Sequence, residues 1–209
     1  MIKAIVFDMD GVLIDAKDWH YEALNKSLLL FGYSINRFEH LTTYDGLPTR
    51  RKLEMLTMER GLPKELHEFI NEMKQLYTTE IVNARCKPTF VHEFALSKFK
   101  AEGYKLGVAS NSVRSTVHMM MEKACLDGYL DWKLSNEDVV NPKPDPEIYL
   151  KAIQQLNLEP HEVLVIEDND HGVKAGIASG AHVMVVKDVD EVSYQNIMAR
   201  ISELNGAIE

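Results

Sequence analysis

The sequence predicts an α/β fold, in which a parallel sheet core carries an inserted all-helical cap domain. Two observations predict this fold. From about residue 90 onward, short apolar runs alternate with helical patterns, which indicates parallel strands joined by helices. Residues 16–86, by contrast, carry helical patterns alone, although an apolar strand precedes them. We therefore expect residues 1–15 and 87–209 to form the core and residues 16–86 to form the cap domain.

The first strand is expected at the apolar run Ala4–Phe7, which leads directly into Asp8 and Asp10. A short apolar run of this kind is typical of a buried parallel strand. Asp8 falls where the strand leaves the sheet, and open α/β sheets bind their ligands at the carboxyl ends of strands. Residues i and i+2 of an extended chain point the same way, so both carboxylates can reach one site. The alternative is an acidic turn, since Asp-Gly is common turn chemistry and Gly11 permits a sharp turn.

The inserted segment is expected to contain three helices, over residues 17–31, 48–60 and 63 to about 85. Apolar residues recur in it at three- and four-residue spacings, as they do along one face of a helix. Pro48 and Pro63 suit the first turns of the second and third helices, and Gly32 is placed to end the first. We expect this segment to lie above the carboxyl ends of the strands, where a mobile cover excludes water during chemistry.

The second half of the chain supplies the rest of the core. Strands are expected over residues 105–109, 132–134, 163–166 and 182–186. Helices are expected over residues 90–102, 113–126, 172–179 and 190–204, with a further helix opened by Asp145-Pro146. Polar residues fall at several of the strand ends, namely Ser110-Asn111, Lys143 in the loop NPKPDP and Glu167-Asp168.

If the first and fourth strands are neighbours, up to four carboxylates converge at one edge of the sheet. Two like charges about 4 Å apart repel by roughly 4 kcal/mol at an effective dielectric constant of 20, so such a cluster needs a counter-ion. Carboxylate oxygens with room for water suit Mg²⁺. With Lys143 as a further cation, the site suits a phosphoryl group, whose transfer depends on positioning and charge neutralisation. One carboxylate can act as a nucleophile, and a second two residues on can move protons.

The composition limits the class of protein and of partner. The 209 residues carry a formal net charge of −9, which argues against a nucleic-acid binder because such a protein needs a basic face. The two cysteines, Cys86 and Cys125, lie far apart and are expected to be reduced thiols of a cytoplasmic protein. No stretch approaches the roughly 18 apolar residues of a membrane span, so no membrane partner is expected.

Four stretches resemble, in this order, the four motifs of the haloacid dehalogenase superfamily: DMDGVLID at residues 8–15, VASNS at 108–112, NPKPDPEIY at 141–149 and IEDNDHG at 166–172. The inserted segment resembles the C1-type helical cap of the branch that contains β-phosphoglucomutase and many small-metabolite phosphatases. The resemblance covers essentially the whole chain. It implies a Rossmann-like core with the first strand at its centre.

The resemblance also implies roles for individual residues. Asp8 would be the nucleophile and Asp10 the general acid/base. The groups that would ligate Mg²⁺ are the Asp8 carboxylate, the Asp10 main-chain carbonyl and Asp168, with Glu167 at or just outside the coordination sphere. The residues that would hold the phosphate are Ser110 and Lys143, with Asn111 nearby as a substrate contact. Asn169 stands where the family usually has serine, and we expect it to preserve a polar contact.

In the cap, His20 stands where the mutase branch places a histidine facing the site, and a helix-surface histidine is the alternative. Thr49 stands where mutases of this branch carry an arginine, which argues against mutase activity. One of the pair Arg50 and Arg51, with Arg50 our choice, would bind substrate, unless the two are only a solvated pair at a helix start. Lys74, near Tyr77, could reach the site, but we interpret it as a surface lysine.

The first hypothesis is therefore a Mg²⁺-dependent phosphatase that hydrolyses a small phosphorylated metabolite through an aspartyl-phosphate. A sugar phosphate or a polyol or amino-alcohol phosphate is the expected substrate, and the protein is expected to be a monomer or a small homo-oligomer. The alternatives are a phosphosugar mutase of the β-phosphoglucomutase type and a non-catalytic binding protein on the same fold.

Overall fold

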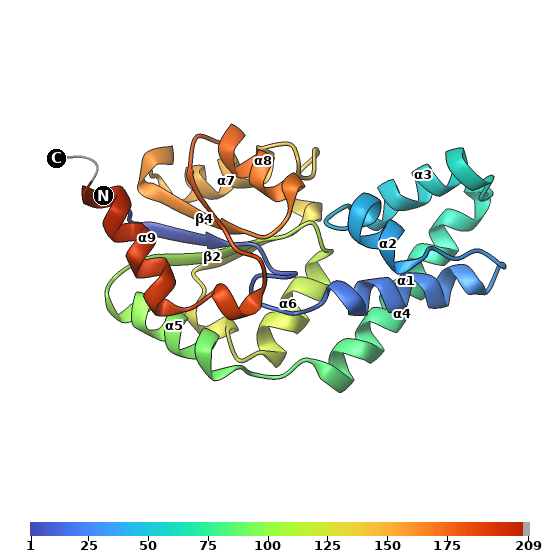
Figure 1. Ribbon diagram of the computed structural model, residues 1–209, viewed down its shortest axis with the longest axis horizontal. Helices are drawn as coiled ribbons and strands as arrows, with labels where there is room; N and C mark the ends of the chain where they lie inside the picture. Colours follow the sequence, from blue (N-terminus) through green and yellow to red (C-terminus); the bar gives the residue numbers. More distant parts are fainter. Residues whose placement is uncertain (207–209) are drawn as a thin grey trace. The chain divides into compact units, whose positions relative to one another are not determined.

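The structure is a computed structural model that describes residues 1–206 (Figure 1). The chain forms two compact units. One contains Met1–Asp15 together with the chain from Lys87 onward, and the other is Ala16–Cys86. None of the helices within residues 1–206 has the length and apolar character that crossing a membrane requires.

In the described part of the first unit, five parallel strands form one sheet in the order β3-β2-β1-β4-β5. The strands are β1 (Ala4–Phe7), β2 (Lys105–Ala109), β3 (Trp132–Leu134), β4 (Val163–Glu167) and β5 (His182–Val185). β1 is central, and its last residue, Phe7, lies opposite Val108 of β2 and Ile166 of β4. The predicted α/β fold with a parallel sheet is confirmed, and the residues that follow β1, β2 and β4 leave the sheet side by side.

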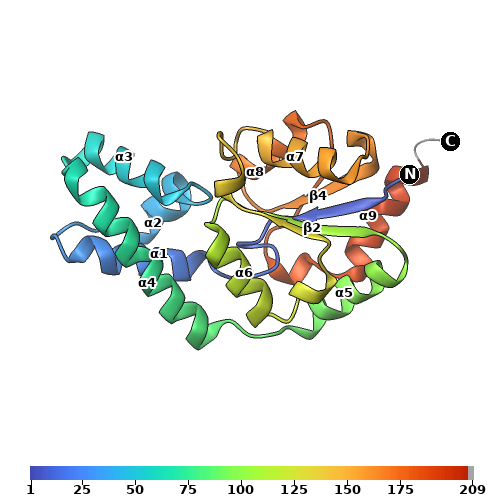
Figure 2. The same ribbon diagram turned by 180° about the vertical axis from the view of Figure 1, so that it is seen from behind.

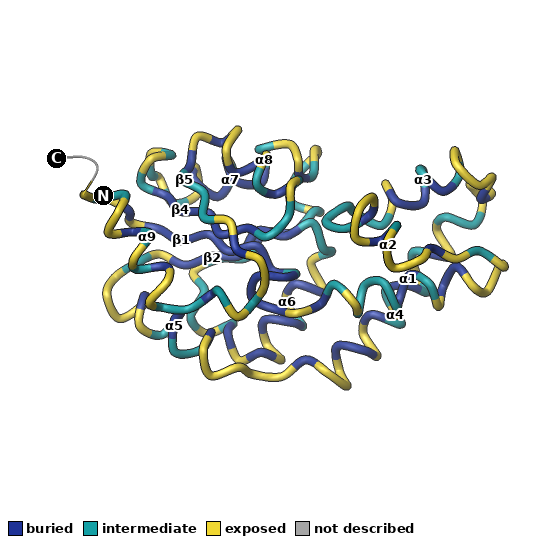
Figure 3. Tube along the Cα trace, viewed as in Figure 1, coloured by how far each residue is buried: buried dark blue, intermediate teal, exposed yellow. Residues whose placement is uncertain are grey.

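Helices cover both faces of this sheet. They are α5 (Phe90–Ala101), α6 (Arg114–Lys123), α7 (Glu147–Leu156), α8 (Asp170–Ala178) and α9 (Tyr194–Gly206). α7 and α8 lie on one face, and α5, α6 and α9 lie on the other (Figures 1 and 2). Alternate residues of β1 point to opposite faces, so that Ala4 and Val6 join Tyr149 of α7 in one core cluster. The central strands are buried along their length (Figure 3).

The second unit is helical. Its elements are α1 (Lys17–Leu29), α2 (Arg37–Glu39), the π-helical turn η1 (His40–Tyr44), α3 (Thr49–Arg60), the 3₁₀ turn η2 (Lys64–Leu66) and α4 (His67–Arg85). The three predicted helices correspond to α1, α3 and η2 with α4, whereas α2 and η1 were not predicted. α1 packs along α4, and Leu24, Leu28, Leu56 and Ile70 contribute to a core that this unit forms by itself. Gly61 ends α3 with a φ of +69°, a conformation that favours glycine.

Candidate active site

Lys143 is the centre of a buried polar cluster at the carboxyl ends of β1, β2 and β4. Its Nζ donates hydrogen bonds to Asp8 Oδ1 at 2.6 Å, to the Ala109 carbonyl oxygen at 2.7 Å and to Glu167 Oε1 at 2.7 Å. An ammonium has three N–H donors, so these partners use all of them. Lys143 is only 3% exposed, and the cluster therefore joins three strand ends with one buried cation.

Three of the four predicted carboxylates converge. Asp8, Glu167 and Asp168 each offer an oxygen atom within 4.8 Å of the others, which is a spacing suited to one shared cation. The atoms available to bind a metal ion are hard carboxylate oxygens, the ligand type that Mg²⁺ prefers. One ammonium does not balance three carboxylates, and the residues present therefore fit a divalent cation in charge as well as in chemistry.

Asp10 lies on the turn that follows Asp8. Gly11 adopts a φ of +91° there, and its N–H donates to the Ile14 carbonyl oxygen at 2.7 Å, which confirms the expected sharp turn. The Ser112 hydroxyl donates to Asp10 Oδ2 at 2.9 Å, so the loop after β2 orients the second acid. Sequence reasoning did not single out Ser112.

Burial raises the pKa of the Asp8 carboxyl well above its usual value; Lys143 opposes this effect, and the charges of Glu167, Asp168 and Asp10 add to it. Burial lowers the pKa of Lys143, but the carboxylates of Asp8 and Glu167 outweigh burial, so the net pKa lies above its usual value. The lysine is therefore held charged, whereas an anionic Asp8 needs additional positive charge beside it.

Glu167 is bonded through both of its oxygens. Oε1 accepts from Lys143 Nζ and, at 2.5 Å, from the hydroxyl of Tyr149, while Oε2 accepts from the Asp168 N–H at 3.2 Å and from Asn169 Nδ2 at 3.4 Å. Asn169 also caps α8, because its Oδ1 accepts from the N–H of His171 at 3.1 Å. The polar contact expected of Asn169 is thus present.

The predicted phosphate-binding residues lie beside Lys143. Ser110 is 1% exposed, and its Oγ accepts from the Ser112 N–H at 3.0 Å. Asn111 Nδ2 donates to the Lys143 carbonyl oxygen at 3.2 Å, and Asn111 Oδ1 accepts from the Lys143 N–H at 3.1 Å. Asn111 therefore holds the loop that contains Lys143 against the end of β2, a role that sequence reasoning missed. Its contact with substrate stays a prediction.

In the helical unit, the interpretation of Lys74 as a surface residue is wrong. Lys74 is 7% exposed, and its Nζ lies 3.2 Å from His20 Nδ1. The reason is helical spacing, since Ile70, Lys74 and Thr78 share the buried face of α4 at four-residue intervals. A lysine ammonium can only donate, so Nδ1 of His20 would be the acceptor in this contact.

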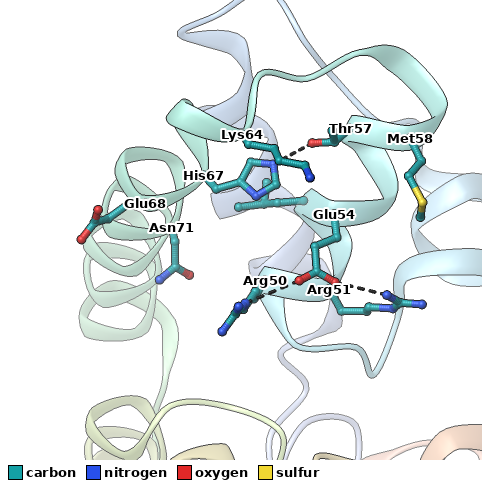
Figure 4. Close-up of a pocket in the computed structure, with 10 residues that line it drawn as sticks. Arg50, Arg51, Glu54, Thr57, Met58, Lys64, His67, Glu68 and Asn71 are labelled. Carbon is teal, nitrogen blue, oxygen red and sulfur yellow. Dashed lines mark hydrogen bonds and ion pairs between the residues drawn. The ribbon is translucent and has the colours of Figure 1, made fainter.

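Arg50 is one of the residues that line a pocket of about 800 Å³ between α3 and the start of α4 (Figure 4). Its Nε is 3.5 Å from Glu54 Oε1, and Arg51 donates to Glu54 Oε2 at 3.2 Å, so Glu54 lies between the two arginines. Their side chains are 89% and 59% exposed. The predicted substrate contact of Arg50 is not tested by this position.

Comparison with known proteins identifies the family of this chain. Residues 5–186 match the family model of the haloacid dehalogenase-like hydrolases. The chain is 30% identical over 182 residues to a phosphorylated carbohydrates phosphatase of Thermotoga maritima, covering 86% of this chain and 82% of the relative. It is 30% identical over 193 residues to the pyrophosphatase PpaX of Bacillus velezensis, with 86% and 80% covered.

Among solved structures, a β-phosphoglucomutase of Clostridium difficile superposes with a TM-score of 0.83 at 22% identity, over 97% of this chain and 98% of that one. At that identity the likeness concerns the fold, which is the fold that the sequence motifs predict. The family match spans all four motifs and the helical segment inserted between the first two. The chain therefore belongs to the haloacid dehalogenase-like hydrolase family.

Proposed function

We propose that this protein is a Mg²⁺-dependent phosphatase that hydrolyses a small phosphorylated metabolite. The observation that carries the proposal is the buried Asp8 carboxylate, held at 2.6 Å by Lys143 and followed two residues later by an acid that Ser112 orients. Relatives named for phosphorylated carbohydrates and for pyrophosphate support a substrate that contains a phosphoryl group. A sugar phosphate or a polyol or amino-alcohol phosphate is the proposed substrate class.

In the proposed reaction, a carboxylate oxygen of Asp8 attacks phosphorus, and the bond from phosphorus to the leaving oxygen breaks. Asp10 gives its proton to that leaving oxygen, which departs as an alcohol. Asp10 then takes a proton from water as the water oxygen attacks the phosphorus of the aspartyl-phosphate, and the Asp8 carboxylate is released with inorganic phosphate. Each residue ends in the protonation state in which it began.

Positive charge at the site comes from two sources. Mg²⁺, when bound, would neutralise charge on the phosphoryl oxygens. The groups that would hold it are the carboxylates of Asp8 and Asp168, Glu167 and the Asp10 main-chain carbonyl. Lys143 is the second source, and it reaches a phosphate oxygen only by giving up one of its three present acceptors. Ser110 adds a hydroxyl donor beside it.

The helical unit is proposed to act as a cap of the C1 type, with His20 and Arg50 as its substrate contacts. A cap limits the size of the substrate, which favours a metabolite over a protein or a nucleic acid. Thr49, in place of the arginine that mutases carry, favours transfer of the phosphoryl group to water over transfer to a second sugar. A cytoplasmic location is part of the same proposal.

The test is phosphate release from p-nitrophenyl phosphate and from a panel of phosphorylated metabolites. We expect turnover with Mg²⁺, loss of turnover with EDTA and recovery when Mg²⁺ is added back. Trapping the phosphorylated protein and following its label to water or to a sugar separates a phosphatase from a mutase. A protein that releases no phosphate from any of these compounds with Mg²⁺ present is a binding protein instead.

A further inference from the structure

Glu167 has two close neighbours that the sequence motifs do not assign. The Tyr149 hydroxyl donates to Glu167 Oε1 at 2.5 Å, and both residues are 0% exposed. On the other side lies Gly172 of α8, where an added Cβ would stand 1.8 Å from Oε1 and 2.2 Å from Oε2. No side chain fits at position 172 while the carboxylate occupies its present place. Gly172 therefore leaves the space that Glu167 fills, and Tyr149 is one of the groups that hold Glu167 there.

Tyr149 contacts the cation of the cluster as well as the acid. Lys143 Nζ lies 4.8 Å from the centroid of the Tyr149 ring, a distance at which an ammonium is attracted to an aromatic face. The ring belongs to the core cluster that α7 forms with β1 and β4, so it has little freedom to move. A phenylalanine at this position would keep the ring and lose only the hydroxyl.

The Tyr149 hydroxyl supplies one of the two hydrogen bonds to a single oxygen of Glu167. Glu167 Oε1 accepts two hydrogen bonds, one from Lys143 and one from Tyr149. Without the hydroxyl, Oε1 keeps only the lysine as its donor. The longer hydrogen bonds to Oε2, from the Asp168 N–H at 3.2 Å and from Asn169 Nδ2 at 3.4 Å, then restrain the carboxylate less against turning about its last side-chain bond. Lys143 bonds Asp8 and Glu167 with the same nitrogen, so a displaced Glu167 changes the direction from which the ammonium meets Asp8.

The geometry points to Tyr149 as a positioning residue for the reaction: its hydroxyl holds Glu167, and through Glu167 it aligns Lys143 on Asp8, in space that Gly172 leaves open. This inference rests on the proposed function for the meaning of that alignment. A tyrosine that served only the hydrophobic core would contribute to stability and not to turnover. The two roles therefore differ in what loss of the hydroxyl does.

The test is Tyr149→Phe in the full chain, with Tyr194→Phe as the matched control because the Tyr194 hydroxyl donates to Glu102, a residue outside the cluster. For p-nitrophenyl phosphate with Mg²⁺, we expect kcat to fall by about tenfold or more, since outer partners of ligating carboxylates typically affect affinity or activity by 10- to 100-fold. KM should stay within about threefold, and the control should stay within about twofold in both constants. A Tyr149→Phe protein whose kcat lies within twofold of the wild type overturns the assignment, whatever its unfolding temperature.

A second measurement separates this inference from the proposed function. Mg²⁺ binding, followed by calorimetry without any substrate, is expected to weaken by about tenfold in Tyr149→Phe and not in Tyr194→Phe. If the wild-type protein releases no phosphate, the proposed function fails, and calorimetry alone decides on Tyr149. Equal Mg²⁺ affinity in the wild-type and Tyr149→Phe proteins then overturns the positioning role.

Discussion

Each of the two units of the chain buries a basic side chain, and the two pKa values shift in opposite directions. In the sheet unit, Lys143 is buried against the carboxylates of Asp8 and Glu167, and its pKa is raised. In the helical unit, burial and the nearby charge of Lys52 lower the pKa of His40 to about 4. The lysine is therefore charged and the histidine neutral at pH 7. Burial alone does not decide the charge of a group, because the partners that are buried with it decide the sign of the shift.

The surroundings of His40 explain its neutrality. Its Nε2 lies 3.2 Å from the Lys17 carbonyl oxygen, and its Nδ1 is buried with no hydrogen-bond partner among residues 1–206. Asp45 favours the charged ring from 3.9 Å, and the charges of Lys52 and His20 oppose it. One distant carboxylate is too little to offset burial, whereas Lys143 has two carboxylates in direct contact.

Removing the charge of Asp8 should have the largest effect on activity. Asp8→Asn keeps the shape of the side chain and leaves Lys143 its bonds to Ala109 and Glu167, so we expect the fold to persist. Turnover of p-nitrophenyl phosphate should fall by more than about 10⁴-fold, as is usual when a nucleophile is removed. Asp18→Asn, at an exposed acid paired with Arg37, is the control and should keep full activity. Retained activity in Asp8→Asn contradicts the nucleophile assignment.

Removing the cation of the cluster should have the largest effect on stability. Lys143→Met leaves the buried carboxylates of Asp8 and Glu167 without their partner, which typically costs about 3–5 kcal/mol of unfolding free energy. Lys100→Met, which removes a 40% exposed lysine paired with Asp131, should cost about 0–1 kcal/mol. Urea unfolding in the absence of added metal measures both. Equal losses in the two variants would remove the contrast between buried and exposed pairs.

His40 makes the stability of the helical unit depend on pH. As pH falls below the ordinary histidine pKa of 6.5, His40 becomes protonated in the unfolded chain. In the folded chain it is not protonated until the pH reaches about 4. The contribution of His40 to stability is therefore complete above that window and is lost as pH falls through it, by about 3 kcal/mol in total.

The measurement is the loss of unfolding free energy between pH 7 and pH 4 in wild type and in His40→Gln, whose side-chain amide can still donate to the Lys17 carbonyl. We expect the loss to be smaller in the variant by about 3 kcal/mol. His118→Gln, at an exposed histidine of α6, should follow the wild type. If His40→Gln also follows the wild type, the pKa of His40 is not lowered in the folded protein, and the contrast with Lys143 disappears.

The smallest effect is expected at the exposed arginines of the helical unit. Arg50→Ala should change the unfolding free energy by no more than about 0.5 kcal/mol, because its pair with Glu54 lies in solvent. With the best substrate of the metabolite panel, KM should rise a few-fold while kcat changes little, as expected for a residue that binds substrate uniformly. Arg51→Ala is the matched control, and an identical KM in both variants and the wild type contradicts a substrate role for Arg50.

Local sequence patterns predicted most of the helices and strands of the fold. The strand Ala4–Phe7 and the strands near residues 105, 132, 163 and 182 are recognisable because apolar runs bounded by polar and glycine residues are a local signal. The short elements α2 and η1 were missed, since a capping box spanning Asn36 and Glu39 is only four residues long and no apolar period accompanies it.

The sequence by itself determined which acids and which lysine to expect at one edge of the sheet, because Asp8, Asp10, Lys143 and Asp168 follow strands or fall in motifs that are readable along the chain. Only the tertiary structure decided which neighbours hold them. Tyr149 resembles any core residue of α7 in sequence, and Lys74 resembles a surface lysine, until packing buries both beside polar partners. Spacing along a helix or strand reports one element at a time, whereas a hydrogen bond between distant segments depends on the packing of several elements at once.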